Sequence, residues 1–285
     1  MGEGKRRPVQ KPRSGIMRER SALPRVCVIG AGNVATHMAL ALSKTARVAQ
    51  ICSRNIEHAR SLAAKLGNGA TASSTDELLP DADFYIIAAN DDSIAEIAAS
   101  TPPYPGIWAH TSGSVPVSVF EGKKDRFGSF YPLQTFSKDV DVDFRRVPMF
   151  IEGSDAETRD ELLALARGIS ESVELADSAR RKALHLAAVF ACNFANLMWL
   201  DADTLMRRER LTVNYLAPLL EVTLQKLRDA TPRDAMTGPG RRGDMAVMRS
   251  QLSALPTELK DTYALLSQRI LDIYHPELRL LPKED

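Results

Sequence analysis

The feature that most constrains the fold of this chain is a glycine-rich turn between an apolar run and an alanine-rich run. The stretch from Val26 to Leu42, VCVIGAGNVATHMALAL, passes directly from apolar residues into the turn and then into helix-forming residues. This order predicts a strand, a tight turn and a helix. In a GxGxxA turn the first glycine allows the tight bend, the second lets a pyrophosphate approach the backbone, and a small third residue lets the helix pack on the strand. Here these residues are Gly30, Gly32 and Ala35.

A turn of this kind predicts a dinucleotide site at the start of the first helix. Free backbone N–H groups and the positive end of the helix dipole favour a pyrophosphate there. The residues expected to bind the cofactor are Gly30, Ala31, Gly32, Asn33 and Val34. The alternative is a glycine turn in an α/β protein that binds no nucleotide, but the position of the motif at the first βα turn favours the dinucleotide.

The end of the second expected strand indicates which dinucleotide binds. Many NAD-binding proteins place a carboxylate there for the ribose 2′-hydroxyl. This chain reads ICSRN, so Ser53 and Arg54 stand at that position. A guanidinium suits the 2′-phosphate of NADP, which a carboxylate would repel. We therefore expect NADP rather than NAD, with the alternative that Arg54 only begins a solvated helix.

Short apolar runs alternate with amphipathic runs from Arg25 to about Leu175, as in βαβ units. This pattern predicts an N-terminal Rossmann domain of the α/β class, with a doubly wound parallel sheet covered on both faces. The expected strands are 26–30, 47–52, 83–89, 106–111 and 147–153. The expected helices between them are 33–44, 55–66, 92–99 and 155–169.

The pattern becomes entirely helical after residue 175. We expect one long helix over 178–206, followed by helices at 212–229, 243–254 and 256–274. The predicted organisation is therefore a basic tail at 1–24, an NADP-binding Rossmann domain at 25–175, and a helical substrate and dimerisation domain at 176–285.

Charge and cysteine usage exclude several classes of function. The chain has 285 residues and a formal net charge of +1, and its first 25 residues hold eight basic residues against two acidic ones. We expect a disordered tail. No basic stripe continues into the remaining chain, which argues against nucleic-acid binding. The three cysteines lack the spacing of a metal site, and no uninterrupted apolar run is long enough to span a membrane. We therefore expect a cytoplasmic protein with no membrane partner and no metal.

Four further motifs resemble one known family. They are HTSGS at 110–114, GSFYPLQTFS at 128–137, KALHLAAVFACNFANL at 182–197 and TGPGRRGD at 237–244. With the glycine turn they resemble the Rossmann-like oxidoreductases that carry the C-terminal domain of unknown function 2520. The chain is more distantly similar to pyrroline-5-carboxylate reductase, deazaflavin-dependent NADP reductase and the 6-phosphogluconate dehydrogenase group. The resemblance implies hydride transfer, an NADP site and a helical domain that helps to form a dimer.

One departure limits what the resemblance implies. Hydroxyacid dehydrogenases of the wider group use a lysine followed by an asparagine one helical turn later. One turn after Lys182 this chain has Leu186, and the nearest asparagine is Asn193. The mechanism of those enzymes is therefore not transferred to this chain.

Two pairs of polar residues follow expected strands, at the edge where such sheets bind ligands. His110 and Ser112 follow one strand and are candidates for work on the nicotinamide or substrate, or alternatively for capping a turn. Asn90 and Asp91 follow another strand and are expected near the cofactor ribose or at a helix cap. In the loop that we expect around Tyr131, Gln134 either binds an amide or carbonyl or stabilises the loop.

The long helix carries four polar residues in an otherwise apolar sequence. Lys182, His185, Asn193 and Asn196 fall on one stripe at about 100° per residue. We expect this helix to be buried, so the stripe meets either a neighbouring helix or a substrate. In the functional alternative, His185 or Lys182 donates the proton and the two asparagines orient the substrate. His185 is preferred, because the ordinary pKa of histidine, about 6.5, lies near neutral pH.

The last motif, TGPGRRGD, is a polar glycine-rich loop before a helix. Its arginines either hold a carboxylate or phosphate of the substrate or are only solvated charges. Taken together, the sequence predicts an NADP-dependent oxidoreductase that acts on a small carbonyl, hydroxyl or imine compound as a homodimer. The alternative from another class is a dinucleotide-binding sensor without turnover.

Overall fold

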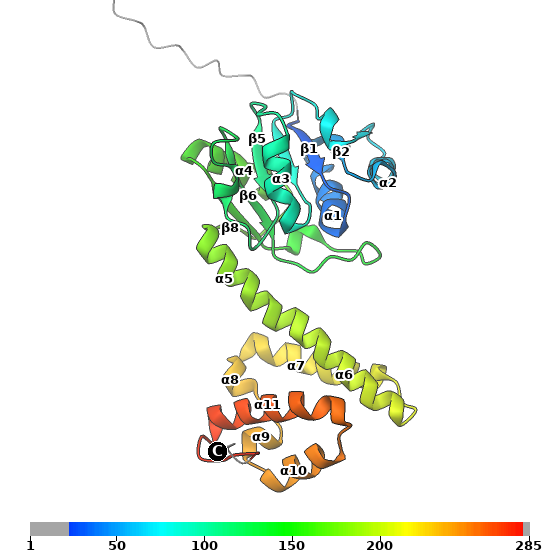
Figure 1. Ribbon diagram of the computed structural model, residues 1–285, viewed down its shortest axis with the longest axis vertical. Coiled ribbons are helices and arrows are strands. Elements are labelled where there is room, and N and C mark those ends of the chain that lie inside the picture. The colour runs from blue at the N-terminus through cyan, green and yellow to red at the C-terminus, as the bar shows by residue number, and fades with distance from the viewer. Residues whose placement is uncertain (1–22, 282–285) are drawn as a thin grey trace, which may run out of the picture. The chain divides into compact units, whose positions relative to one another are not determined.

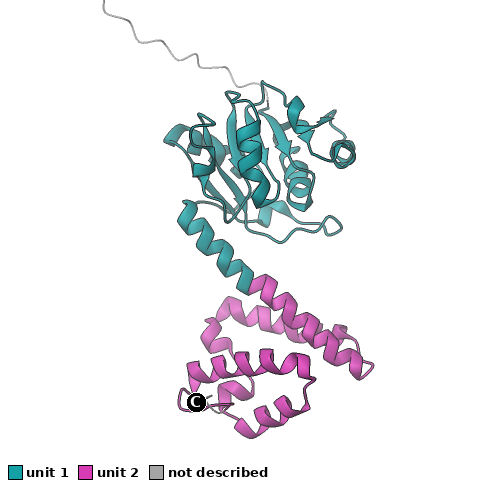
Figure 2. Cartoon of the chain, viewed as in Figure 1, with its two compact units in different colours: residues 1–190 teal, residues 191–285 magenta. Residues whose placement is uncertain are grey.

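The computed structural model describes residues 23–281 and divides them into two compact units, which meet in sequence at Phe190 and Ala191 (Figure 2). Unit 1 contains an eight-stranded sheet in the order β3-β2-β1-β4-β5-β6-β7-β8 (Figure 1). All neighbouring strands are parallel except β6 and β7. The strands are β1 (Arg25–Ile29), β2 (Arg47–Cys52), β3 (Thr71–Ser73), β4 (Phe84–Ile87), β5 (Ile107–His110), β6 (Phe127–Pro132), β7 (Met149–Gly153) and β8 (Val173–Leu175).

Helices cover both faces of this sheet, because side chains alternate between two cores along each strand. In β1, Val26 and Val28 face one core, and Cys27 and Ile29 face the other. The first core is closed by α1 (Asn33–Leu42), α2 (Ile56–Leu66) and α4 (Ala156–Arg167). The second is closed by α3 (Asp91–Ser100) and the short helix η2 (Val117–Phe120). This confirms the expected doubly wound Rossmann sheet.

Three strands escaped the sequence analysis. β3 and β8 have three residues each, which is too short for a clear period. β6 runs through the segment that we expected to be a loop, so Tyr131 lies on a strand and not in a loop. The reason for this error is that glycine at 128 and proline at 132 suggest a turn, whereas here the strand is fixed by pairing with β5 and β7.

The long helix is observed as α5 (Ser178–Ala188), a π-helical stretch (Val189–Phe194) and α6 (Ala195–Arg208). α5 belongs to unit 1. The two units therefore divide after Phe190, later in the chain than the boundary that we expected near residue 176. The expectation of a buried helix is wrong for the single chain, since only Arg181 of α5 and no residue of α6 is buried.

Unit 2 contains helices and no strand among its described residues, which confirms the expected helical C-terminal part. After α6 it comprises η5 (Val213–Leu216), α7 (Ala217–Asp229), α8 (Pro232–Ala235), α9 (Pro239–Arg242), α10 (Met245–Ala254) and α11 (Thr257–Tyr274). Its small core joins Met248 of α10 to Leu271 of α11 and to Leu280. The tail expected at 1–24 lies almost wholly outside the described residues.

Candidate active site at the carboxyl edge of the sheet

The strand order reverses between β1 and β4, because β2 and β3 continue to one side of β1 and β4 to β8 to the other. In doubly wound sheets, ligands bind at the carboxyl ends of the strands beside such a reversal. β1, β4, β5 and β6 are mutually parallel, so the residues that follow them share this edge. The glycine turn, Asn90, the 110–113 segment and the end of β6 therefore belong to one region of unit 1.

The glycine turn has the backbone that a dinucleotide site requires. Gly30 has a φ of 131°, and a Cβ there would lie 2.1 Å from the carbonyl oxygen of Ala88, so only glycine fits. Gly32 is exposed, and a Cβ built on it meets no atom within 4 Å. The backbone over Gly32 is therefore open to a ligand at the start of α1.

The first turn of α1 lacks the groups that would compete with an anion. Its N-cap, Gly32, provides no side-chain hydrogen bond, and the turn contains no acidic residue. Asn33 instead donates its Nδ2 to the carbonyl of Phe136 at 2.9 Å, while His37 contacts the carbonyl of Ser137 at 2.9 Å and stacks on Phe136. These contacts fix the 136–137 segment beside α1 and leave the first backbone N–H groups for a pyrophosphate.

The end of β2 fits the 2′-phosphate of NADP. Arg54 is exposed and forms no hydrogen bond or ion pair with any residue that the structure describes. Asn55 caps α2, since its Oδ1 accepts from Glu57 N at 3.1 Å, and the hydroxyl of Ser53 accepts from Asn55 N at 3.3 Å. A phosphate could therefore reach Arg54 without displacing a carboxylate.

Asn90 and Asp91 stand at the start of α3, where Asn90 is the N-cap but forms no side-chain capping hydrogen bond. Both residues are exposed. Both residues thus stand at the carboxyl end of β4, and their position near a ribose stays a prediction.

His185 is the polar residue of the long helix that the structure places at this edge. The hydroxyl of Tyr131 lies 3.1 Å from its Nδ1, and the two rings meet edge to face with centroids 6.1 Å apart. The imidazole packs against the backbone of Gly113, where an added Cβ would lie 2.6 Å from His185 Cγ. The ring therefore has a fixed place between β6 and the segment after β5.

The Tyr131 phenol stays protonated at neutral pH. Burial raises the pKa of Tyr131 to about 12, against a smaller opposing effect of the Arg181 charge. Tyr131 can therefore orient His185 through a hydrogen bond without losing its own proton.

Arg181 fastens α5 to the sheet. It is fully buried, and its guanidinium donates to the carbonyl oxygens of Ser112 at 3.1 Å and Val115 at 2.7 Å. It also pairs with Glu152 of β7, which accepts a hydrogen bond from Ser178 Oγ at 2.8 Å. Because a buried charge is tolerated only when it is paired, this network fixes one turn of α5, and His185 lies one turn further on.

The Nδ1 atom of His110 and the hydroxyl of Ser112 are engaged in local hydrogen bonds, whereas Nε2 of His110 is buried without a hydrogen-bond partner among the described residues. His110 is fully buried, and burial together with the Arg181 charge lowers the pKa of this imidazole to about 3. Its Nδ1 accepts from Ser112 N at 3.2 Å, and Ser112 Oγ accepts from the backbone N–H of Ser114 and Val115, both at 3.0 Å. A neutral, buried imidazole is less suited to donate a proton than the partly exposed His185. His110 and Ser112 shape the loop on which His185 packs, and a catalytic part for either of them stays a prediction.

The other three polar residues on the helix stripe form no side-chain hydrogen bond with His185 or its neighbours in the described residues. Lys182 is exposed, and so are Asn193 and Asn196, and none of them has a hydrogen bond or ion pair among residues 23–281. The π-helical stretch at 189–194 also interrupts the 100° period on which the stripe was drawn. Gln134 is exposed, and its Oε1 accepts from Thr135 N at 2.8 Å.

Sequence reasoning missed Arg181, Glu152 and the partnership of Tyr131 with His185. Arg181 stands between Arg180 and Lys182, and nothing in a run of three basic residues marks the buried one. One signal could have identified Arg181. It lies four residues before His185, so the two residues share one face of the helix and meet the same surface.

Comparisons with known proteins show the family to which this chain belongs. Residues 25–110 match the family model described as NADP oxidoreductase, coenzyme F420-dependent, and residues 147–270 match the domain of unknown function DUF2520. A search of curated proteins found no match. A solved structure of a Bacteroides fragilis protein assigned as an NADP oxidoreductase is 39% identical, with a TM-score of 0.79, over 87% of this chain and 97% of that one.

More distant structures share the fold. A reductive aminase from Aspergillus terreus, in complex with NADPH and ethyl-5-oxohexanoate, is 16% identical, with a TM-score of 0.68, over 88% of this chain and 95% of that one. A 1-pyrroline-5-carboxylate reductase from Streptococcus pyogenes is 12% identical, with a TM-score of 0.62, over 88% of this chain and 98% of that one.

Proposed function

We infer the activity of this chain from its family: it belongs to the NADP oxidoreductases that carry the DUF2520 domain. Its cofactor is therefore NADP, which the glycine turn, the uncapped start of α1 and Arg54 fit. We propose that it reduces a small carbonyl or imine compound or oxidises the corresponding hydroxyl or amine. In the reduction, bound NADPH would supply the hydride, and in the oxidation NADP+ would accept it.

In this proposal the cofactor lies along the carboxyl edge of the sheet. The backbone at Gly30, Ala31, Gly32, Asn33 and Val34 holds the pyrophosphate. Ser53 and Arg54 hold the 2′-phosphate, and Asn90 and Asp91 lie near the ribose. The expected preference for NADPH over NADH depends on the single charge of Arg54.

His185 donates the proton to the substrate atom that gains negative charge. The observation that carries this proposal is its contact with Tyr131 and Gly113 at the edge to which the glycine turn also belongs. In the protonated imidazole, Nδ1 donates to the Tyr131 oxygen and Nε2 carries the proton to be transferred. After transfer Nδ1 keeps its proton and its partner, so the ring need not turn. We retain Lys182 as the second candidate donor, and Asn193 and Asn196 as candidates for orienting the substrate.

Two variants test this assignment. His185→Gln removes the proton donor and is expected to lower turnover by roughly 10²- to 10⁴-fold while the affinity for NADPH stays unchanged. Tyr131→Phe keeps the ring but loses the hydroxyl, so we expect a smaller loss of kcat together with a shifted pH profile. His58→Gln, on the exposed surface of α2, is the matched control. A folded His185→Gln protein with full turnover would exclude His185 as the donor.

We also propose that the protein is a cytoplasmic homodimer formed through its helical unit. Most of the large apolar side chains that are exposed in the described chain lie between residues 186 and 227. The helix Ser178–Arg208 is long and apolar enough to cross a membrane, and none of the tested window is buried. It also carries Asp201, Asp203 and Arg207, which are costly inside a bilayer. A second copy presents the same apolar surface, so a twofold dimer covers both at once.

A further inference from the structure

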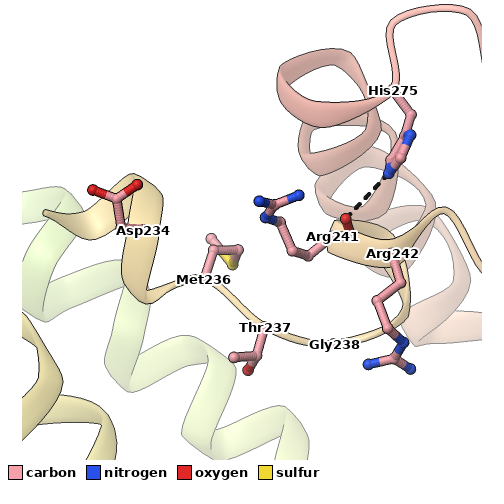
Figure 3. Close-up of a pocket in the computed structure, with 7 residues that line it drawn as sticks. All are labelled: Asp234, Met236, Thr237, Gly238, Arg241, Arg242 and His275. Carbon is pink, nitrogen blue, oxygen red and sulfur yellow. Dashed lines mark hydrogen bonds between the residues drawn. The ribbon is translucent and has the colours of Figure 1, made fainter. Parts of the chain in front are cut away.

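Unit 2 contains a pocket to which the proposed function assigns no role. It has a volume of about 570 Å³ and is formed largely by the TGPGRRGD segment and the end of α11 (Figure 3). The residues that line it are Asp234, Met236, Thr237, Gly238, Arg241, Arg242 and His275. All of them belong to unit 2, so the pocket is complete within that unit.

Arg241 is the arginine of this pocket that is free to bind an anion. Its guanidinium lies over the ring of Tyr274, with 4.3 Å from Cζ to the ring centroid. It forms no hydrogen bond or ion pair with any described residue, although Arg242 beside it pairs with Asp244 at 2.8 Å. Stacking on an aromatic ring fixes the plane of a guanidinium and leaves the N–H groups at its edge free to bind an anion.

The backbone around Arg241 is held by a second set of contacts. A ring nitrogen of His275, Nε2, lies 3.1 Å from the Arg241 carbonyl oxygen, and Figure 3 shows this contact. Gly238 has a φ of 98°, and a Cβ built on it would meet nothing within 4 Å. Glycine at 238 is thus required by the backbone angle and not by crowding, and the chain beside Arg241 is open to a ligand.

The residues that line the pocket include two arginines and one carboxylate, and one of the arginines, Arg242, is already paired with Asp244. Arg233 does not line the pocket but lies near the Tyr274 ring, at 5.5 Å from Cζ to the ring centroid, and within residues 23–281 its guanidinium donates only to the carbonyl of Ile273. The pocket contains a single carboxylate, that of Asp234, which accepts from the Thr231 hydroxyl at 2.6 Å and pairs with none of these arginines. Thr237 adds a hydroxyl that has no hydrogen-bond partner in the described part of the chain.

We propose that this pocket binds a small oxyanion, a carboxylate or a phosphate, through a two-pronged contact with the Arg241 guanidinium. A guanidinium fork matches both groups in geometry and charge. The proposal concerns unit 2 alone and does not depend on the proposed reduction. The anion belongs either to the substrate itself or to a separate small molecule, and kinetics distinguish these two sources.

The test is calorimetric titration of the full-length protein with sodium acetate and with inorganic phosphate, at constant ionic strength. The protein is first saturated with NADP, so that the glycine turn and Arg54 are filled and do not bind the probe. We expect saturable binding of at least one probe. Arg241→Gln should raise its Kd tenfold or more, and Arg249→Gln, an exposed arginine on α10, should leave the Kd within twofold.

Two results would overturn the proposal. One is the absence of saturable binding of either probe up to about 50 mM. The other is an equal Kd for the wild-type protein and Arg241→Gln. If Arg241→Gln lowers Tm, Arg241→Lys serves instead. It keeps the charge and loses the fork, so its Kd should also rise, and an unchanged Kd contradicts the proposal.

Kinetics distinguish the two sources of the anion. Once a substrate is known, inhibition by the probe that is competitive with the substrate assigns the pocket to the substrate. Binding without inhibition assigns it to a separate anion. Both outcomes support the pocket itself, and neither requires that His185 is the proton donor.

Discussion

Arg181 determines how α5 contributes to the candidate site. It is the one charged side chain of α5 that is fully buried, and its hydrogen bonds reach the segment after β5 while its ion pair reaches β7. The same charge helps to keep His110 neutral and opposes the effect of burial on Tyr131. One buried guanidinium therefore lowers the pKa of both His110 and Tyr131.

A prediction at this scale concerns Arg54 and the choice of cofactor. Arg54→Ala should weaken NADPH binding by about 1.5 to 3 kcal/mol, since it removes a charged hydrogen-bond partner of the 2′-phosphate. NADH has no such phosphate, so its affinity should change little. Fluorescence titration of both cofactors checks this result, with Arg60→Ala on the exposed side of α2 as the control. An equal loss for NADPH and NADH would show that Arg54 has only a structural role.

At the scale of single elements, the helices of unit 1 begin in two ways. α2, α4 and α5 each begin with a side chain that caps backbone N–H groups. α1 begins with an uncapped glycine, and α3 begins with Asn90, which forms no capping hydrogen bond. The capped helices need no ligand to satisfy their first turn. The start of α1 is left for the cofactor, which is consistent with its position at the reversal of strand order.

The cap of α4 gives a prediction for stability against pH. Asp155 accepts from Thr158 N at 2.8 Å and from its hydroxyl at 2.7 Å, and these bonds lower the pKa of Asp155 to about 2. Its folded pKa lies below its unfolded pKa, so its contribution is complete above about pH 4 and is lost as the pH falls toward 2.

We expect Asp155→Ala to reduce the free energy of unfolding by about 1 kcal/mol at pH 7, and by less at pH 3. Asp155→Asn keeps a capping oxygen without the charge and should be the milder change at pH 7. Urea unfolding of the three proteins at both pH values provides the measurement. A deficit in Asp155→Ala that is the same at pH 7 and pH 3 would contradict this account.

The sequence sufficed for the long elements, because β2 is a nearly continuous apolar run between amphipathic segments and α11 shows the helical period of 3.6 residues. It did not suffice for β6, where the strand is imposed by its neighbours, or for the π-helical stretch, which has no marker in the pattern. The glycine turn was predictable because its geometry permits few residues. The contact of Tyr131 with His185 was not, since it joins residues far apart in the chain, and its geometry depends on the ion pair of Arg181 with Glu152.

For the molecule as a whole, the apolar surface of the helical unit predicts self-association. Leu200 on α6 and Leu219 on α7 are both more than half exposed. Light scattering at micromolar concentration should give twice the mass of one chain. Leu200→Asp and Leu219→Asp, which place a charge in the proposed interface, should shift the mass toward the monomer, whereas Val140→Asp in unit 1 should not. A monomer mass for the wild-type protein would exclude the dimer.

The central claim is that this chain transfers a hydride between NADPH and a small substrate. The most direct measurement supplies NADPH carrying deuterium at C4, on each face in turn, with a panel of keto acids, aldehydes and cyclic imines, and analyses the products by mass spectrometry. We predict that a product gains one deuterium from one of the two cofactors only, because a fixed site presents one face of the nicotinamide. The account would be contradicted if the protein binds NADPH tightly and no compound of the panel gains deuterium from either cofactor.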